Sequence, residues 1–240
     1  ERDEAELKLA ARQDETVALA ARGRGMTFPN PCVGAVIARD GRILGEGWHR
    51  FFGGPHAEVD ALQPLGGAAR GATVVVTLEP CCHWGKTPPC ADFLVRSKVR
   101  EVVAAIMDPL PQIRGRGFGR LRRGGVRVRL WKDGPQREQA RGVAGPYLTW
   151  LRSRRPFVIL KSAVSLDGKI ATSAGESKWI TSAAARAQSI AQHADDPFIV
   201  LLTLDHSSLP APIYIARNRE DVVSRGNTYL AYPFQISLPT

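Results

Sequence analysis

Residues 33–48 read Val33-Gly-Ala-Val-Ile-Ala-Arg-Asp-Gly-Arg-Ile-Leu-Gly-Glu-Gly-Trp48. Apolar residues on both sides of Asp40-Gly41 predict two short strands, Val33–Ala38 and Arg42–Trp48. The Asp-Gly pair supplies the positive φ angles that a tight hairpin turn needs. We therefore expect an antiparallel hairpin in this stretch.

Helices and strands alternate on both sides of this hairpin. Upstream, Ala and Leu recur at helical spacing and predict a helix over Ala5–Ala21 that stops at Gly23 and Gly25. Downstream, periodicity and breakers predict helices over His56–Leu65, Ala91–Ser97, Gly117–Arg123 and Gln136–Leu151, with strands over Ala72–Leu78, Val99–Ile106 and Val126–Leu130. This alternation is typical of an α/β fold with a layered sheet.

A basic stretch at Arg152–Pro156, followed by the apolar segment Phe157–Val164, marks a change in composition. We therefore predict two domains, residues 1–150 and residues 151–240. In the second domain, Ile180–Gln192 has a helical pattern and Phe198–Leu204 an extended one.

Composition indicates a folded globular protein. Of the 240 residues, 44% are hydrophobic and 23% are charged, which is close to ordinary globular usage. No apolar run approaches the roughly 20 residues of a membrane-spanning helix. The charged start, Glu1-Arg-Asp-Glu4, shows no secretory signal. We expect a cytoplasmic protein that does not bind or cross a membrane.

The formal net charge of +10 is concentrated in one segment. Between Leu110 and Pro156 there are twelve Arg and one Lys against Asp133 and Glu138. Two interpretations stay open: a solvated surface and linker, or attraction for a phosphate-bearing substrate or nucleic acid.

The strongest chemical signal is His56-Ala-Glu58 followed by Pro80-Cys81 and, after eight residues, Cys90. One imidazole and two thiolates suit Zn²⁺, and three protein ligands leave a fourth position for a water whose pKa the ion lowers to about 7. Glu58 would then move protons without being a ligand. These residues predict a zinc-dependent deaminase.

Other cysteine and histidine residues allow alternatives. Cys82 or His83 as a fourth ligand would instead make a closed structural zinc site. Adjacent cysteines share one tetrahedral ion poorly, so we expect Cys82 to be a packed thiol. Cys32 begins an apolar strand and is expected to be a small buried side chain. His49 either faces the substrate or lies on the surface.

Several motifs resemble the bifunctional riboflavin-biosynthesis deaminase/reductase family. They are Asn30-Pro-Cys-Val-Gly-Ala-Val-Ile37, Gly47-Trp-His49, His56-Ala-Glu-Val59 and Leu78-Glu-Pro-Cys-Cys-His-Trp-Gly-Lys-Thr-Pro-Pro-Cys90. Cytidine and tRNA-adenosine deaminases place two residues between the cysteines, whereas the family shares the eight found here. The resemblance implies a cytidine-deaminase-like three-layer α/β/α domain, followed by a partial dihydrofolate-reductase-like α/β domain.

The resemblance also implies a reaction and a substrate site. The reaction is hydrolytic removal of the 2-amino group from 2,5-diamino-6-ribosylamino-4(3H)-pyrimidinone 5′-phosphate. Asn30 and His49 would hold the pyrimidine or ribose, and Lys86 the phosphate. Leu110 stands where the family has Asn, and its side chain cannot donate the hydrogen bond that the family's phosphate contact implies. We expect Arg114 or Arg116 to replace that contact.

A second resemblance starts at Leu160-Lys-Ser-Ala-Val-Ser-Leu-Asp-Gly-Lys-Ile-Ala171 and continues in Gly175-Glu-Ser-Lys-Trp-Ile-Thr-Ser182. It implies an NADPH-dependent reductase, with Ala163 and Trp179 at the cofactor and Ser177 at the substrate. Past Arg186 the likeness thins, because about a dozen family residues have no counterpart between His193 and Asp195.

Our leading hypothesis is a riboflavin-pathway zinc deaminase that also uses NADPH if its reductase part is competent. We expect a homo-oligomer that acts on a small ribotide and not on nucleic acid. Two alternatives remain, a tRNA or nucleotide base deaminase and a non-enzymatic zinc or nucleic-acid-binding module.

Overall fold

The structure is a computed structural model that describes residues 2–154, 157, 164–169, 172–176, 180–185, 187, 199–202 and 213–216. The chain divides into two compact units, Glu1–Phe157 and Val158–Thr240. The predicted division at residues 150 and 151 stays a prediction.

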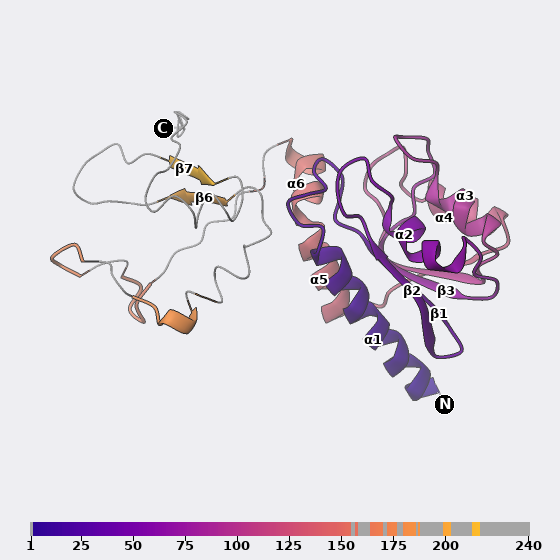
Figure 1. Ribbon diagram of the computed structural model, residues 1–240, viewed down its shortest axis with the longest axis horizontal. Coiled ribbons are helices and arrows are strands. Elements are labelled where there is room, and N and C mark those ends of the chain that lie inside the picture. Colours follow the sequence, from indigo (N-terminus) through magenta and orange to yellow (C-terminus); the bar gives the residue numbers. More distant parts are fainter. Residues whose placement is uncertain are drawn as a thin grey trace. The chain divides into compact units, whose positions relative to one another are not determined.

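The first unit contains a five-stranded sheet in the order β2-β1-β3-β4-β5 (Figure 1). Its strands are β1 (Gly34–Arg39), β2 (Arg42–Trp48), β3 (Thr73–Leu78), β4 (Glu101–Ile106) and β5 (Arg127–Leu130). Strand β1 runs antiparallel to β2 and β3, whereas β3, β4 and β5 are parallel. At the predicted hairpin turn, Asp40 and Gly41 have φ values of 51° and 76°.

Helices cover both faces of this sheet. Helices α1 (Arg2–Ala21) and α5 (Pro135–Val143) pack on one face, and α2 (Ala57–Leu62), α3 (Cys90–Arg96) and α4 (Arg116–Arg123) pack on the other (Figure 1). Successive β3 residues alternate between the two cores, because Val74 and Val76 join the α2–α3–α4 cluster and Val75 joins the α1–α5 cluster. The predicted three-layer α/β/α fold is confirmed.

Two predicted helices are shorter than expected because of proline. The helix predicted over His56–Leu65 ends at Leu62 and continues as a 3₁₀ turn, η1 (Gln63–Leu65), which contains Pro64. The stretch Gln136–Leu151 is two helices, α5 and α6 (Gly145–Ser153), because Pro146 lies in the first turn of α6. Proline lacks an N–H and clashes with the carbonyl four residues earlier, so neither helix continues through it.

Close packing at glycine places α2 directly on β2. A Cβ atom at Gly47 would lie 2.3 Å from the Ala61 nitrogen and 2.6 Å from the Ala57 carbonyl oxygen. Only a residue without a side chain permits this approach. The packing fixes the start of α2, and therefore His56 immediately before it.

In the second unit, strands β6 (Ile199–Leu202) and β7 (Ile213–Ala216) form an antiparallel pair. Strand β6 lies within the extended segment predicted over Phe198–Leu204. None of the helices in the described part of the chain combines the length and apolar character needed to cross a membrane.

Candidate active site

A cavity of about 260 Å³ lies where β3 ends and where α2 and α3 begin. Loops that follow the carboxyl ends of parallel strands commonly form binding sites in α/β sheets. Its lining residues come from five segments and are Asn30, Pro31, Val33, His49, Phe52, Gly53, Gly54, His56, Glu58, Leu78, Glu79, Cys81, His83, Gly85, Lys86, Thr87, Asp108, Leu110, Ile113 and Tyr147.

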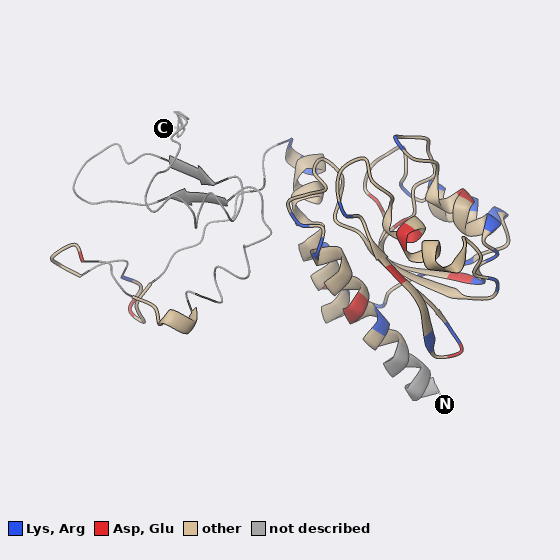
Figure 2. Cartoon of the chain, in the orientation of Figure 1, with Lys and Arg blue, Asp and Glu red and all other residues tan. Residues whose placement is uncertain are grey.

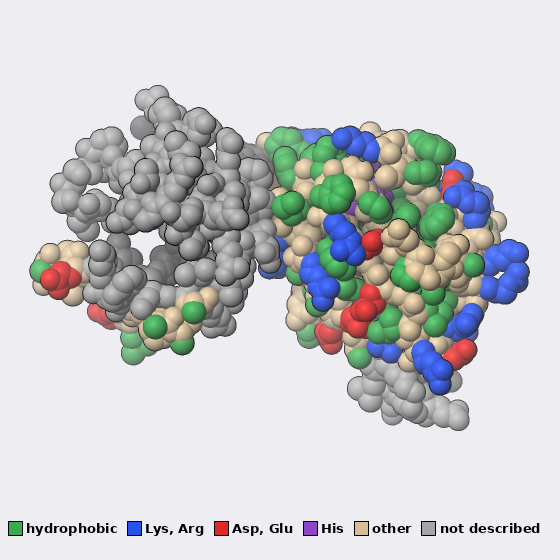
Figure 3. Space-filling view, in the orientation of Figure 1, with side chains coloured by type: hydrophobic (Ala, Val, Ile, Leu, Met, Phe, Trp, Pro, Cys, Tyr) green, Lys and Arg blue, Asp and Glu red, His purple; other side chains and the backbone are tan. Residues whose placement is uncertain are grey.

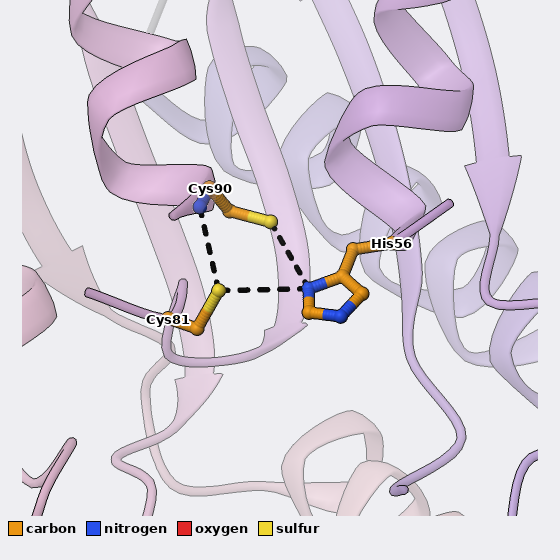
Figure 4. A group of neighbouring side chains, drawn as sticks. All are labelled: His56, Cys81 and Cys90. Atoms are coloured by element: carbon orange, nitrogen blue, oxygen red, sulfur yellow. Dashed lines mark hydrogen bonds between the residues drawn. The ribbon is translucent and has the colours of Figure 1, made fainter. Parts of the chain in front are cut away.

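The three predicted metal ligands converge at this cavity. Figure 4 shows His56 at the start of α2, Cys81 in the loop after β3 and Cys90 at the first turn of α3. The His56 Nδ1 atom lies 3.2 Å from the Cys90 Sγ and 3.5 Å from the Cys81 Sγ. The Cys90 backbone N–H donates to the Cys81 Sγ at 3.3 Å. The two sulfurs and one nitrogen are thus arranged around a common point.

The two cysteines have different hydrogen-bonding roles: the Cys90 thiol donates and the Cys81 sulfur accepts. The hydrogen bond from the Cys90 side chain is the largest cause that lowers the pKa of Cys81, and His56 lowers it further. The same hydrogen bond, followed by burial, raises the pKa of Cys90. The hydrogen bond with Cys81 raises the pKa of His56. A thiolate with a nearby imidazole is a ready cation ligand.

The donor set fits a zinc ion. The ligand atoms of His56, Cys81 and Cys90 all lie within 4.8 Å of one another, and one nitrogen with two sulfurs is the ligand chemistry that zinc accepts. Within the described residues this group has three members. Cys82 and His83 both lie outside this group. The Cys82 Sγ instead lies 3.7 Å from the Gln112 carbonyl oxygen. The alternative of a closed site with four protein ligands therefore has no support among the described residues.

Glu58 is enclosed beside the ligands. It is the second residue of α2, lines the cavity and has only 3% of its surface exposed. Burial raises the pKa of its carboxyl group, and the nearby His56 opposes this rise. Its side chain also hydrogen-bonds with Cys90. A carboxyl group whose pKa is raised in this way holds a proton more readily than one in water, which suits a group that accepts and returns protons.

His49 and Asn30 form a fixed pair in the cavity wall. The His49 Nδ1 lies 2.8 Å from the Pro55 carbonyl oxygen, which can only accept, so Nδ1 carries the proton. Burial lowers the pKa of His49, which favours the neutral ring. Its Nε2 therefore accepts from the Asn30 Nδ2 at 3.1 Å. His49 lines the cavity and is not a surface residue.

The mouth of the cavity combines a cation with aromatic side chains. The Lys86 Nζ lies 3.9 Å from the centre of the Phe52 ring, and both residues line the cavity. Trp84, between His83 and Gly85, is 76% exposed. In Figure 3, hydrophobic side chains are numerous on the upper part of the visible face, and a histidine shows among them.

Of the residues considered for the phosphate contact, Leu110 lies in the cavity wall and the two arginines do not. Leu110 lines the cavity, so an apolar side chain occupies that part of the wall. Arg114 and Arg116 are exposed and are not among the lining residues. Cys32 also lies outside the metal group and is half-buried against the α1–α5 core.

Sequence reasoning missed four residues of the site. Thr87 Oγ1 lies 3.2 Å from the His56 Nε2. The buried Glu79 carboxylate accepts from the backbone N–H groups of Asp108, Gly115 and Phe118 and so holds the loop after β4. Tyr147 donates to Asp108 at 2.9 Å. The Glu-Pro-Cys motif could have drawn attention to Glu79, but no local pattern joins Asp108 to a residue on α6.

Ion pairs account for part of the basic segment. Arg120 pairs with Asp92, Arg129 with Glu101, Arg137 with Asp133 and Arg141 with Glu138. Figure 2 shows that basic residues are also spread over the first unit outside this segment. These contacts favour the interpretation as a solvated surface.

The predicted reductase residues Ala163, Ser177 and Trp179 lie outside the described residues.

Two protein-family descriptions match the chain. "Cytidine and deoxycytidylate deaminase zinc-binding region" matches residues 11–106, and "RibD C-terminal domain" matches residues 156–203. The first range contains all three grouped ligands and Glu58.

Curated proteins that are similar in sequence to this chain carry the name of the same family. "Riboflavin biosynthesis protein RibD" of Aquifex aeolicus is 47% identical over 170 residues, which cover 71% of this chain and 47% of the relative. The protein of the same name from Escherichia coli is 49% identical over 168 residues, covering 70% and 45%. The chain therefore spans about half the length of the curated relatives it matches.

The solved structures that are similar to this chain include proteins of the same family. Acinetobacter baumannii RibD has a TM-score of 0.65 and 43% identity, covering 78% of this chain and 51% of its own. The Thermotoga maritima diaminohydroxyphosphoribosylaminopyrimidine deaminase/5-amino-6-(5-phosphoribosylamino)uracil reductase has a TM-score of 0.66 and 42% identity, covering 75% and 52%.

Proposed function

Because the chain is a homologue of the RibD riboflavin-biosynthesis proteins over the half of their length that it spans, we propose that residues 1–150 are a zinc-dependent deaminase. Its substrate would be 2,5-diamino-6-ribosylamino-4(3H)-pyrimidinone 5′-phosphate, and its products the corresponding aminouracil ribotide and ammonia. The observation that carries this proposal is the grouping of His56, Cys81 and Cys90 beside a buried Glu58 in one cavity.

His56, Cys81 and Cys90 would hold the zinc ion. When bound, zinc supplies Lewis-acid activation of water for hydrolysis. Glu58 would take a proton from the attacking water and deliver it to the substrate ring nitrogen and then to the departing amine. Its burial supports this role, because the raised pKa lets the carboxyl group hold a transferred proton.

Other cavity residues would bind and orient the substrate. Since the Asn30 amide nitrogen is directed at His49, the oxygen is the atom that Asn30 can offer to a substrate N–H group. The His49 ring holds that amide in place. Lys86 at the mouth would meet the 5′-phosphate as a point charge.

Ammonia release tests the proposal. We expect purified wild-type protein to release ammonia from the diaminopyrimidine ribotide and not from cytidine or tRNA. Glu58→Gln should keep zinc but lose about 10²–10⁴-fold in kcat, because an amide cannot shuttle protons. Glu138→Gln, an exposed change outside the cavity, is the matched control and should have wild-type turnover.

Three outcomes would count against this function. Turnover by Glu58→Gln at the wild-type rate would reassign the proton-moving role. Zinc binding without any deaminase activity would favour the non-enzymatic module, and activity on tRNA or cytidine alone would favour the base-deaminase alternative.

We propose further that residues 151–240 are part of an NADPH-dependent reductase that acts on the deaminated product. The match of residues 156–203 to the RibD C-terminal domain supports this. By the same likeness, Ala163 and Trp179 would contact NADPH and Ser177 the substrate. NADPH oxidation in the presence of the aminouracil ribotide tests it, and absence of oxidation in active deaminase would overturn it.

A cytoplasmic location and a homo-oligomeric state complete the proposal. Cell fractionation and light scattering of the purified protein check these two expectations.

A further inference from the structure

One side chain of the segment between the two cysteine ligands contacts the third ligand. Thr87 lines the cavity, and its Oγ1 lies 3.2 Å from the Nε2 of His56. The opposite ring nitrogen, Nδ1, faces both sulfurs at 3.2 and 3.5 Å. The His56 ring therefore has a contact at each nitrogen, with the two sulfurs at Nδ1 and the Thr87 hydroxyl at Nε2.

The direction of the Thr87 hydrogen bond follows from the chemistry of imidazole. A ring nitrogen that binds a cation must be unprotonated, so when Nδ1 is the ligand atom the neutral ring carries its proton on Nε2. The Nε2–H group then donates to the Thr87 Oγ1. Such a partner selects the tautomer and the ring orientation of a metal-binding histidine.

We propose that Thr87 is a positioning residue of the zinc site, which holds His56 in the tautomer and orientation that direct Nδ1 at the two thiols. This inference rests on the proposed function. Thr87 acts through His56 and is distinct from Lys86 beside it, whose side chain lies against Phe52.

The backbone around Thr87 explains how this contact is held. Pro88 and Pro89 follow Thr87 and lead into Cys90, the first residue of α3. Proline fixes its own φ angle and restricts the residue before it, so Thr87 and Cys90 are joined by a stiff connection. The Gly85 N–H donates to the Thr87 carbonyl at 3.2 Å, which closes the loop on the other side. One short segment thus supplies both a ligand and the support for another ligand.

The test compares zinc affinity in variants that separate the hydroxyl from the methyl group. Thr87→Val replaces the hydroxyl with a methyl of similar size, whereas Thr87→Ser keeps the hydroxyl and removes the methyl. Competition of the full chain with a chromophoric zinc chelator should show a loss of about 10–100-fold in affinity for Thr87→Val. Thr87→Ser should stay close to wild type.

Two controls separate positioning from folding. Thermal unfolding of the metal-free proteins should show the same transition in both variants. If Thr87→Val does not fold, Thr87→Ala, which removes atoms without adding any, replaces it in the comparison with Thr87→Ser. In ¹⁵N-labelled zinc-loaded wild type, NMR should show the His56 proton on Nε2, exchanging more slowly with solvent than in the variant without a hydroxyl.

The outcomes distinguish this inference from the proposed function. Wild-type affinity in Thr87→Val, or an equal loss in Thr87→Ser, would overturn the role of the hydroxyl while leaving the zinc site intact. A wild-type protein with no affinity for zinc would instead overturn the proposed function on which the inference depends.

Discussion

At the scale of single residues, the cavity depends on side chains that are buried together with their hydrogen-bonding partners. No buried side-chain nitrogen or oxygen of the described residues lacks a hydrogen-bond partner, and the wall contains the pairs His49–Asn30 and Asp108–Tyr147. Buried polar groups without partners would cost about 1–3 kcal/mol each. The same pairing that stabilises the wall therefore fixes the atoms that it presents to a ligand.

Lys86 should contribute to substrate binding more than to the chemical step. Lys86→Ala removes the cation at the cavity mouth, and we expect KM to rise by about tenfold with little change in kcat, which is the pattern for an interaction present equally in ground and transition states. Steady-state kinetics measure both constants. Arg114→Ala, an exposed change outside the cavity wall, is the control, and a larger effect on kcat than on KM in Lys86→Ala would reassign the lysine.

Asp108 should make stability depend on pH. Burial raises its pKa in the folded protein above the ordinary value of 3.8. The folded state then binds more protons than the unfolded state between these two pKa values, so stability falls as pH rises through this window. Asp108→Asn removes this titration. We expect the free energy of unfolding of wild type, relative to Asp108→Asn, to decline from about pH 4 upward and then level off above the folded pKa.

Urea unfolding at a series of pH values measures this difference. Tyr147→Phe offers an internal check, because the Tyr147 hydrogen bond lowers the pKa of Asp108 and its loss should extend the decline to higher pH. A difference between wild type and Asp108→Asn that does not change with pH would show that Asp108 is not perturbed by folding.

At the scale of elements, local pattern and long-range contact account for different parts of the structure. The hairpin at Asp40-Gly41 and the strand Thr73–Leu78 follow from turn chemistry and β-branched runs, so the sequence is sufficient for them. The grouping of His56, Cys81 and Cys90 could also be predicted, because their residue types and spacing are chemically specific. The helix breaks at Pro64 and Pro146 were not predicted from the sequence, because apolar periodicity continues past both prolines. Proline is itself a signal for such a break.

Other features needed the folded chain. The contact between Tyr147 and Asp108 joins residues 39 positions apart, and that between Thr87 and His56 joins residues 31 apart. Neither follows from a local period, because both depend on how α6 and the segment before α3 pack. The sequence therefore predicts the ligands of the site better than the side chains that support them.

The contact between α2 and β2 should tolerate no added atoms. In Gly47→Ala the new methyl group would overlap the α2 backbone, and we expect a loss of about 1–3 kcal/mol in the free energy of unfolding. Chemical denaturation measures this loss. Gly142→Ala on α5, where nothing lies within 4 Å of the added Cβ, should leave stability unchanged or raise it. Equal stability of Gly47→Ala and wild type would mean that α2 can shift away from the strand.

At the scale of the whole molecule, the first unit contains its own core. Both apolar clusters are built from residues that precede Phe157. The α1–α5 cluster includes Ala140, Val143 and Ala144, so it depends on the helices that follow β5. The proposed deaminase site and the core that supports it thus belong to the same unit.

A fragment of residues 1–157 should fold and deaminate without the second unit. We expect a cooperative thermal transition, bound zinc and a kcat close to that of the full chain. A shorter fragment, residues 1–130, loses α5, which packs with α1 on one face of the sheet, and exposes the apolar side chains that α5 covers, so it should aggregate or unfold. Loss of activity in a well-folded 1–157 fragment would show that the second unit contributes to the deaminase.

The exposure of Trp84 gives the protein a built-in optical signal. An indole that is mostly in water emits at long wavelength and is accessible to iodide, whereas Trp131 is buried and shielded. Since the neighbours of Trp84 on both sides line the cavity, occupation of the mouth by a ribotide should shift its emission and slow its quenching. Because Trp150 is exposed as well, the part of the signal that a Trp84→Phe variant lacks is the part that reports on binding, and it can be followed in the absence of turnover.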